Sequence, residues 1–150
     1  MNPEGCYFLR PGVVSVSWDP QSSSVHLETQ GGWADSAEFQ AASEAVIEGL
    51  RAHRASRLLG NGRNLRVVKQ ADQDWMSDDW MPRAIAAGLR RMALVIPKSV
   101  LARMNLEQMV GKAPEGKLET AYFETLEEAR AWLNLSPVRA TSGAVTALEP

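Results

Sequence analysis

The sequence contains a single cysteine, Cys6, and only two histidines, His26 and His53. One cysteine cannot form an intrachain disulfide, so a reducing compartment is the simplest interpretation, and we expect the protein to be cytoplasmic. No two of these three residues have the spacing of metal ligands, and they fall on separate predicted elements. We therefore expect no metal site and no Cys–His catalytic pair.

Long apolar runs and an excess of one charge are also absent. No stretch of the sequence has the length of a transmembrane helix, and Met1–Gly5 does not begin a signal peptide. The 16 basic and 18 acidic side chains give a net charge of −2, whereas domains that bind nucleic acid are usually strongly basic. We expect neither a membrane span nor a nucleic-acid partner.

What the sequence does contain is hydrophobic periodicity. Val14, Val16 and Trp18 alternate with serines, and a second alternating segment begins at Val25 after a short turn, which predicts an antiparallel hairpin. Further strands are predicted at residues 58–59, 92–96 and 118–123, and helices at about 36–53, 72–89, 98–110 and 126–133. The five apolar residues of 92–96 are typical of an interior parallel strand.

These elements predict an α/β fold. We expect a layered mixed sheet of four or five strands, in which an N-terminal antiparallel hairpin is followed by β-α-β-α-β-α and helices cover the sheet. One domain over residues 1–135 is expected, because 150 residues with 45% hydrophobic side chains suffice for one core. Residues 136–150 lack bulky apolar periodicity and are predicted to form a flexible C-terminal tail.

Four segments of the chain occur in a distinctive combination: the hairpin VVSVSWD…SVHLETQGGW, the segment LLGNGRNL, the segment DQDWMSDDWMPRAIAAGLRRMALVIP and the closing AYFETLEEARAWL. This combination resembles the bacterial SpoIIAA-like, or STAS-like, domain proteins. Those proteins share a fold with anti-sigma-factor antagonists and, more distantly, with CRAL-TRIO lipid-transfer domains. The most specific parts are W-x4-W-x-P-R-A from Trp75 to Ala84 and E-E-A-x-x-W-L from Glu127 to Leu133.

The sequence departs from the antagonists at their phosphorylation switch. They carry Asp-Ser-Ser/Thr-Gly after the strand that corresponds to Leu58–Leu59, whereas this chain has Asn61-Gly62-Arg63-Asn64 and no hydroxyl-bearing residue between Gly60 and Met76. Relatives often place an aspartate where Asn61 stands. The resemblance therefore implies the fold and a binding or regulatory role, but not the serine switch.

A ligand site is predicted where the parallel strands end, because ligands of open α/β sheets bind beyond the carboxyl ends of the strands. The residues expected near it are Asn61, Arg63, Trp75, Trp80 and Ser99. The tryptophans could supply an apolar wall and Arg63 an anion contact, which suits a small amphipathic or lipid-like molecule. The alternatives are that the tryptophans are core packing and that the basic run of residues 51–69 is a solvated face.

No cofactor fingerprint or catalytic constellation is found, so we predict no cofactor and a non-enzymatic module that acts through protein–protein interaction. One alternative is a carrier or sensor of an amphipathic ligand, and another is a small hydrolase or transferase that uses Asp72, Asp74 or His53. A homodimer is expected. The predicted helix over residues 98–110 has more apolar positions than one buried stripe needs. We therefore predict that it forms the dimer interface, with Leu101, Met104 and Met109 as the candidate contact residues.

Overall fold

A computed structural model of the chain describes residues 5–30, 35–111 and 116–135. In chain order its elements are β1 (Cys6–Arg10), β2 (Val14–Asp19), β3 (Ser24–Thr29), α1 (Ser36–His53), β4 (Arg57–Asn61), α2 (Gln70–Trp75), η1 (Met76–Trp80), α3 (Met81–Ala86), β5 (Arg91–Val95), α4 (Val100–Val110), β6 (Glu119–Phe123) and α5 (Leu126–Leu133). The predicted tail lies outside the described residues.

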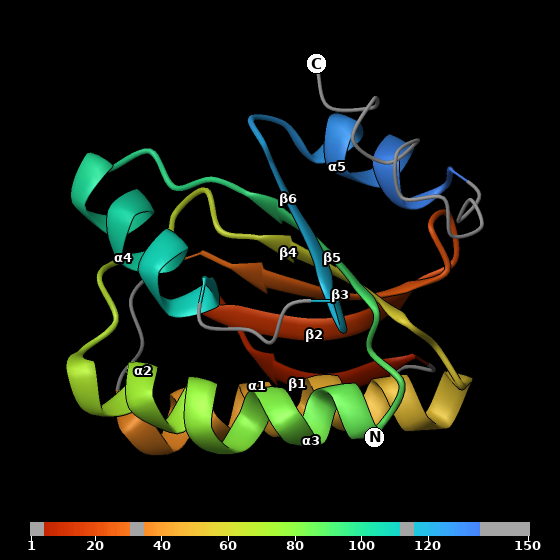
Figure 1. Cartoon of the computed structure of the whole chain (residues 1–150), viewed down its shortest axis with the longest axis horizontal. Coiled ribbons are helices and arrows are strands. Elements are labelled where there is room, and N and C mark those ends of the chain that lie inside the picture. Colours follow the sequence, from red (N-terminus) through yellow and green to blue (C-terminus); the bar gives the residue numbers. More distant parts are fainter. Residues whose placement is uncertain (1–4, 31–34, 112–115, 136–150) are drawn as a thin grey trace.

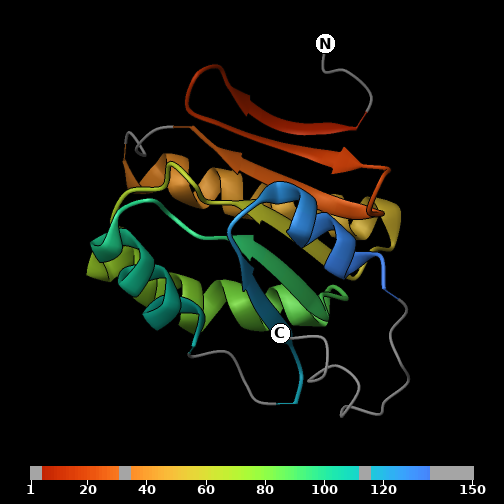
Figure 2. The same cartoon turned by 90° about the horizontal axis from the view of Figure 1, so that it is seen from above.

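Six strands form one mixed sheet in the order of the sequence, from β1 at one edge to β6 at the other (Figure 2). The pairs β1–β2 and β2–β3 are antiparallel, and β3 to β6 are parallel. Because each parallel strand is added on the same side of the previous one, right-handed crossovers place α1, α2–α3 and α4 on one face. Figure 1 shows α5 on the opposite face.

Each face of the sheet has its own hydrophobic core. The larger core lies under α1, α3 and α4 and contains Val16, Leu50 and Trp80, and the smaller one lies between β4, β5 and α5 and contains Leu59 and Leu133. All five residues of β5 are buried, which confirms the prediction of an interior strand. The α/β fold class is confirmed, with six strands where four or five were expected.

The additional strand is β1. Its pairing with β2 shifts register between Cys6 and Phe8, so that both Tyr7 and Phe8 pack against the larger core. A bulge of this kind breaks the alternation by which a strand is recognised in a sequence. The position of β1 at the edge, with Leu9 and Arg10 exposed, weakens the pattern further.

The predicted helix over 72–89 contains a change of helical type. The chain continues from α2 through the π-helical turn η1 into α3, whose first turn contains Pro82. Proline has no N–H to donate and its ring clashes with the preceding turn of a regular α-helix. A wider π turn directly before it relieves that clash without ending the helix.

Three of the helices begin with a side-chain cap. The side chain of Asp35 accepts from Glu38 N at 2.9 Å, Ser99 from Ala102 N at 3.2 Å, and Thr125 from Glu128 N at 3.1 Å. Each satisfies one of the N–H groups that a helix leaves unpaired at its start. Within the described part of the chain, no helix is long and apolar enough to cross a membrane.

Candidate functional site

The loops that follow β3, β4 and β5 meet beyond the carboxyl ends of these strands and form an open hollow of about 330 Å³. The residues that line it are Gln30, Arg63, Asn64, Leu65, Arg66, Lys98 and Ser99. Two of the five predicted ligand residues, Arg63 and Ser99, therefore lie in one place. Asn61 is the last residue of β4, two residues before Arg63, and its side chain bonds to the backbone of the loop that follows.

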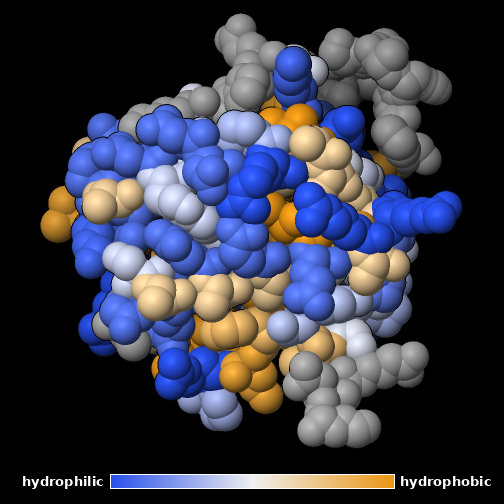
Figure 3. All heavy atoms as spheres, turned by 90° about the horizontal axis from the view of Figure 1, so that it is seen from below, coloured by the Kyte–Doolittle hydropathy of each residue, from blue (hydrophilic) through white to orange (hydrophobic). Residues whose placement is uncertain are grey.

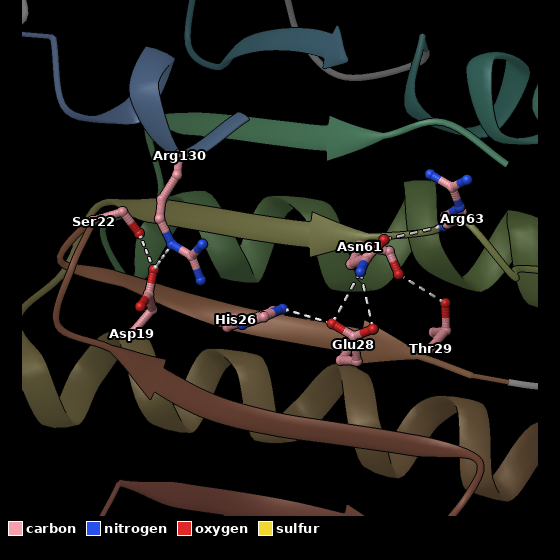
Figure 4. Close-up of polar contacts among 8 residues, drawn as sticks. All are labelled: Asp19, Ser22, His26, Glu28, Thr29, Asn61, Arg63 and Arg130. Atoms are coloured by element: carbon pink, nitrogen blue, oxygen red, sulfur yellow. Dashed lines mark hydrogen bonds and ion pairs between the residues drawn. The ribbon is translucent and has the colours of Figure 1, made fainter. Parts of the chain in front are cut away.

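Asn61 connects β3, β4 and the loop that follows (Figure 4). Its Nδ2 donates to both carboxylate oxygens of Glu28, at 3.1 and 2.9 Å, and its Oδ1 accepts from the backbone N of Arg63 at 3.3 Å. Its carbonyl oxygen accepts from Thr29 Oγ1 at 3.0 Å. With its amide groups bonded in this way, Asn61 positions the loop that carries Arg63.

Two loops of the hollow are joined through their backbones. Gly62 N donates to the carbonyl of Val95 at 3.1 Å, and Lys98 N donates to the carbonyl of Arg63, also at 3.1 Å. A Cβ atom at residue 62 would lie 3.0 Å from the Val95 carbonyl oxygen, so the close approach of the strands favours glycine. The backbones of Arg63 and Lys98 are held together although their side chains are exposed.

The hollow is positively charged. Arg63, Arg66 and Lys98 are all exposed, and none of them forms an ion pair with a carboxylate of the described residues. Unpaired cations on neighbouring loops attract anionic groups and can donate charge-assisted hydrogen bonds to them. The geometry suits a carboxylate, a phosphate or an acidic peptide segment.

Beside the hollow, His26 and Glu28 lie on the sheet face that carries α5. His26 Nε2 and Glu28 Oε1 are 2.9 Å apart. Burial tends to raise the pKa of Glu28, but the hydrogen bonds with His26 and Asn61 outweigh it and hold this pKa below its usual value. A carboxylate stabilised in its ionised form is a weak general base, so this pair is better explained as structural than as catalytic.

A second polar contact on this face ties α5 to the β2–β3 turn. Arg130 Nε donates to Asp19 Oδ2 at 2.9 Å, and Ser22 Oγ donates to the same oxygen at 2.5 Å (Figure 4). Burial tends to raise the pKa of Asp19, and the bonds from Ser22 and Arg130 lower it by more. The contact holds α5 at a defined place over the sheet.

Neither predicted tryptophan lines the hollow. Trp80 is 3% exposed, and its Nε1 donates to the Ser43 carbonyl of α1 at 2.7 Å. Trp75 is half-buried and packs edge-on against Phe39, with ring centroids 6.1 Å apart. The prediction that Trp80 forms a ligand wall is wrong, because its helix turns that side chain toward α1; core packing is the correct interpretation.

The outward side of α4 carries three large apolar side chains. Val100, Leu101 and Met104 are 71, 68 and 59% exposed. Val67, 54% exposed, lies on the loop that α4 holds through a hydrogen bond of 2.7 Å from Val68 N to Asn105 Oδ1. These four residues are called the α4 patch below. Met109 is 5% exposed and belongs to the core, so its assignment to an interface is wrong.

By contrast, hydrophilic side chains cover much of the face formed by α1, α2 and α3, and hydrophobic groups show between them in separate areas (Figure 3). One ion-pair cluster on this face joins α3 to α1, because Arg83 bonds to Glu44 at 2.5 Å and to Asp79 at 2.8 Å.

The residues of the hydrolase alternative are not brought together. The ring of His53 stacks on Trp18 at 3.8 Å, whereas Asp72 and Asp74 lie on α2, where Asp74 accepts from Gln70 Nε2 at 2.9 Å. Among the residues that the structure describes, no group of three or more His, Cys, Asp or Glu side chains could hold a metal ion.

Sequence reasoning did not place Lys98, Arg66 and Gln30 in the hollow. Arg66 belongs to the basic run of residues 51–69, but Gln30 and Lys98 come from two other loops. Their proximity follows from the parallel register of β3, β4 and β5, which no local pattern reveals.

The SpoIIAA-like family model matches residues 27–134, from β3 to the end of α5. The chain belongs to the SpoIIAA-like family. This match covers the hollow, the α4 patch, the smaller core and most of the larger core, and leaves β1 and β2 outside it. A search of curated proteins finds no match to this chain. SpoIIAA-like domains are STAS-type modules, a class that generally binds or regulates and does not catalyse.

Asn61 provides the first test of this SpoIIAA-like site. Replacing Asn61 with aspartate removes both donors to Glu28 and places a second carboxylate beside it. We expect a loss of about 1–3 kcal/mol in the free energy of unfolding at pH 7, measured by urea denaturation. The control is Asn64→Asp, a charge change in the same loop at an exposed residue, which we expect to have little effect.

The loss should shrink in acid. The folded-state pKa of Glu28 is lowered, so the stability it contributes is present above its unfolded pKa of about 4.3 and is lost as the pH falls through the folded value. In Asn61→Asp, protonation of one carboxylate also removes the repulsion. Equal losses at pH 7 and in acid would contradict the charge-based explanation.

Proposed function

We propose that this protein is a cytoplasmic regulatory binding module that acts through protein–protein interaction, and that the α4 patch is its contact surface. The observation that supports this is a concentration of exposed apolar side chains. Of the seven large hydrophobic residues that are exposed in the described part of the chain, four form the patch. Scattered exposed hydrophobic residues are ordinary, but adjacent ones mark interaction surfaces.

Charge around the patch indicates the kind of partner. Arg63, Arg66 and Lys98 lie on the loops beside the first turn of α4, and Arg103 lies on α4 itself. Among the described residues, the ion pair of Arg103 is a long contact of 3.4 Å to Glu107, and both side chains are largely exposed. A partner segment with apolar residues flanked by carboxylates would bury the patch and neutralise these cations. Aliphatic burial would provide affinity, and the charges would provide orientation and rapid association.

The alternative is a carrier or sensor of a small amphipathic ligand, held by Asn61, Arg63 and Ser99. The lining of the hollow favours only the polar end of such a molecule, because Leu65 is the one large apolar residue among the described residues that line it. Trp75 and Trp80, which would have formed the apolar wall, pack in the helical layer. Native mass spectrometry of gently purified protein distinguishes the two functions, since a carrier retains its small molecule.

The protein-interaction proposal predicts a specific loss of binding in the double variant Leu101→Asp, Met104→Asp. Both side chains are mostly exposed, so the fold should survive while the apolar contact is lost. We expect affinity capture with quantitative mass spectrometry to identify a partner that the double variant retains at least about tenfold less, followed by direct titration with the purified partner. Binding to wild type should also weaken between about 50 and 500 mM salt.

The control is Leu9→Asp, which adds one carboxylate at a hydrophobic residue that is 56% exposed on β1, away from the patch. The partner should bind this variant as it binds wild type. If wild type, Leu9→Asp and the double variant capture the same proteins in equal amounts, the α4 patch is not the contact surface and the proposal fails.

A further inference from the structure

β6 is an edge strand with a regular backbone. It pairs with β5 on one side, and no other strand of the described residues pairs with it (Figure 2). The opposite edge, β1, is interrupted by a bulge and followed by Pro11, features that protect an edge against pairing with another chain. β6 contains neither a bulge, a proline nor a lysine in its five residues, Glu119–Phe123.

The hydrogen bonds to β5 determine which groups of β6 remain available. Glu119 N donates to the Arg90 carbonyl at 2.8 Å, and the Phe123 carbonyl accepts from Ile96 N at 2.9 Å. Because successive residues of a strand direct their backbone groups to opposite sides, Glu119, Ala121 and Phe123 face β5. Thr120 and Tyr122 therefore direct their N–H and C=O groups away from the sheet.

Space for another strand exists beside these groups. An open groove of about 860 Å³ follows the outer edge of β6 and is lined by side chains from both faces of the strand. Phe123, Trp132 and Leu135 form its apolar wall on the α5 side, and Tyr122 and Arg103 lie on the α4 side. Tyr122 is 37% exposed and Leu135 is 41% exposed, so both side chains can lose further contact with water.

We propose that β6 pairs in antiparallel fashion with β6 of a second copy of this chain, about a two-fold axis at Ala121. In this register Thr120 lies opposite Tyr122 of the second copy, and the reverse pair follows by symmetry. The outward-facing residues are thus matched only with each other and form four backbone hydrogen bonds. The proposal uses β6 and not the α4 patch, so it goes beyond the function proposed above.

The side chains of β6 favour this self-pairing. Ala121, with the smallest side chain of the strand, lies opposite its own copy on the axis, where a larger residue would meet itself. Glu119 lies opposite Phe123 of the second copy, so no like charges face each other. Glu119 is already bonded to Arg91 at 2.9 Å. The pairing would extend the sheet continuously across both copies and would cover the apolar wall of the groove.

A cysteine on the axis tests the register. In a Cys6→Ser background, Ala121→Cys places two cysteines opposite each other at a non-hydrogen-bonded pair, where Cα atoms lie about 4.5 Å apart, within the range of a disulfide. We expect mild oxidation to give a linked dimer of twice 16.5 kDa on non-reducing gels. Thr120→Cys is the matched control, because residue 120 faces residue 122 of the second copy and should remain unlinked.

A proline tests the outward hydrogen bonds without relying on oxidation. Thr120→Pro removes an N–H that points away from β5, so the β5–β6 bonds remain while the edge loses a donor. We expect sedimentation to show a dimer for the wild type and a dissociation constant at least about tenfold higher for Thr120→Pro. Leu9→Lys, at the opposite edge, should leave the dimer unchanged.

Three outcomes would overturn the proposal. One is a wild-type protein that remains monomeric up to about 100 µM, which would leave the edge to an extended segment of a different protein. Another is a dimer that Thr120→Pro leaves intact while Ala121→Cys does not crosslink, which would place the interface elsewhere. The third is equal crosslinking of Ala121→Cys and Thr120→Cys, which would show random collision.

Discussion

Replacing Trp80 with alanine is expected to lower the free energy of unfolding by about 3–5 kcal/mol. The indole is 3% exposed in the larger core, and its Nε1 donates to the Ser43 carbonyl at 2.7 Å. Alanine would leave a cavity between η1 and α1 and a buried carbonyl without its donor. Urea denaturation followed by circular dichroism measures the loss without depending on tryptophan fluorescence.

Two further variants separate the contributions at this residue. Trp80→Phe keeps most of the ring volume and removes only the donor, so a loss of about 1–3 kcal/mol is expected. Trp75→Ala is the matched control, because Trp75 is only half-buried where it packs against the larger core; it should cost less than Trp80→Ala. A Trp80→Ala protein as stable as wild type would show that the indole is not core packing and would reopen the prediction of a ligand wall.

Replacing Arg91 with alanine is expected to cost about 3 kcal/mol, because it removes one partner of a largely buried ion pair. The Arg91 side chain is 8% exposed and bonds to Glu119 on β6 at 2.9 Å. It also donates to the carbonyls of Trp132 and Leu135 at 3.3 and 3.1 Å, and its guanidinium lies 4.1 Å from the ring centroid of Trp132. One cation thus fastens both β6 and the end of α5 to β5.

Hydrogen exchange can show which part of the protein Arg91→Ala destabilises. Amides of α5 should lose protection more than those of α1, because only the smaller core depends on this side chain. Arg91→Met retains the aliphatic bulk and shows how much the charge contributes. The control is Arg103→Ala, whose contact to Glu107 is exposed and should be worth less than about 1 kcal/mol. Equal loss of amide protection in α1 and α5 would contradict the proposal that Arg91 specifically holds α5 and β6 against β5.

Local sequence patterns predicted most of the secondary structure. The helix expected over residues 36–53 has those bounds, with Asp35 as its cap, and Arg91–Val95 is the buried interior strand. These features follow from interactions within a few residues, namely side-chain periodicity and the capping of free N–H groups. The same patterns missed β1, because its bulge turns both Tyr7 and Phe8 toward one core.

For the candidate site, the sequence predicted a position beyond the ends of the parallel strands and five residues near it. The parallel strands end where expected, and Arg63 and Ser99 line the hollow there. The contribution of Lys98 and Gln30, and the support that Asn61 receives from Glu28, depend on strand register. Register pairs residues that are far apart in the chain, and periodicity within one segment carries no information about it.

By itself, the sequence determined the α/β class, the helix caps, the interior strand and the resemblance to the SpoIIAA-like family. Only the tertiary structure decided whether the apolar side of each helix packs against the core or faces solvent. Leu101 and Met109 lie on the same short helix, yet one is 68% exposed and the other 5%, and Trp80 faces α1 and not a ligand. The physical reason is that helical spacing states which side chains share a side of an element, whereas burial depends on which other element packs against that side.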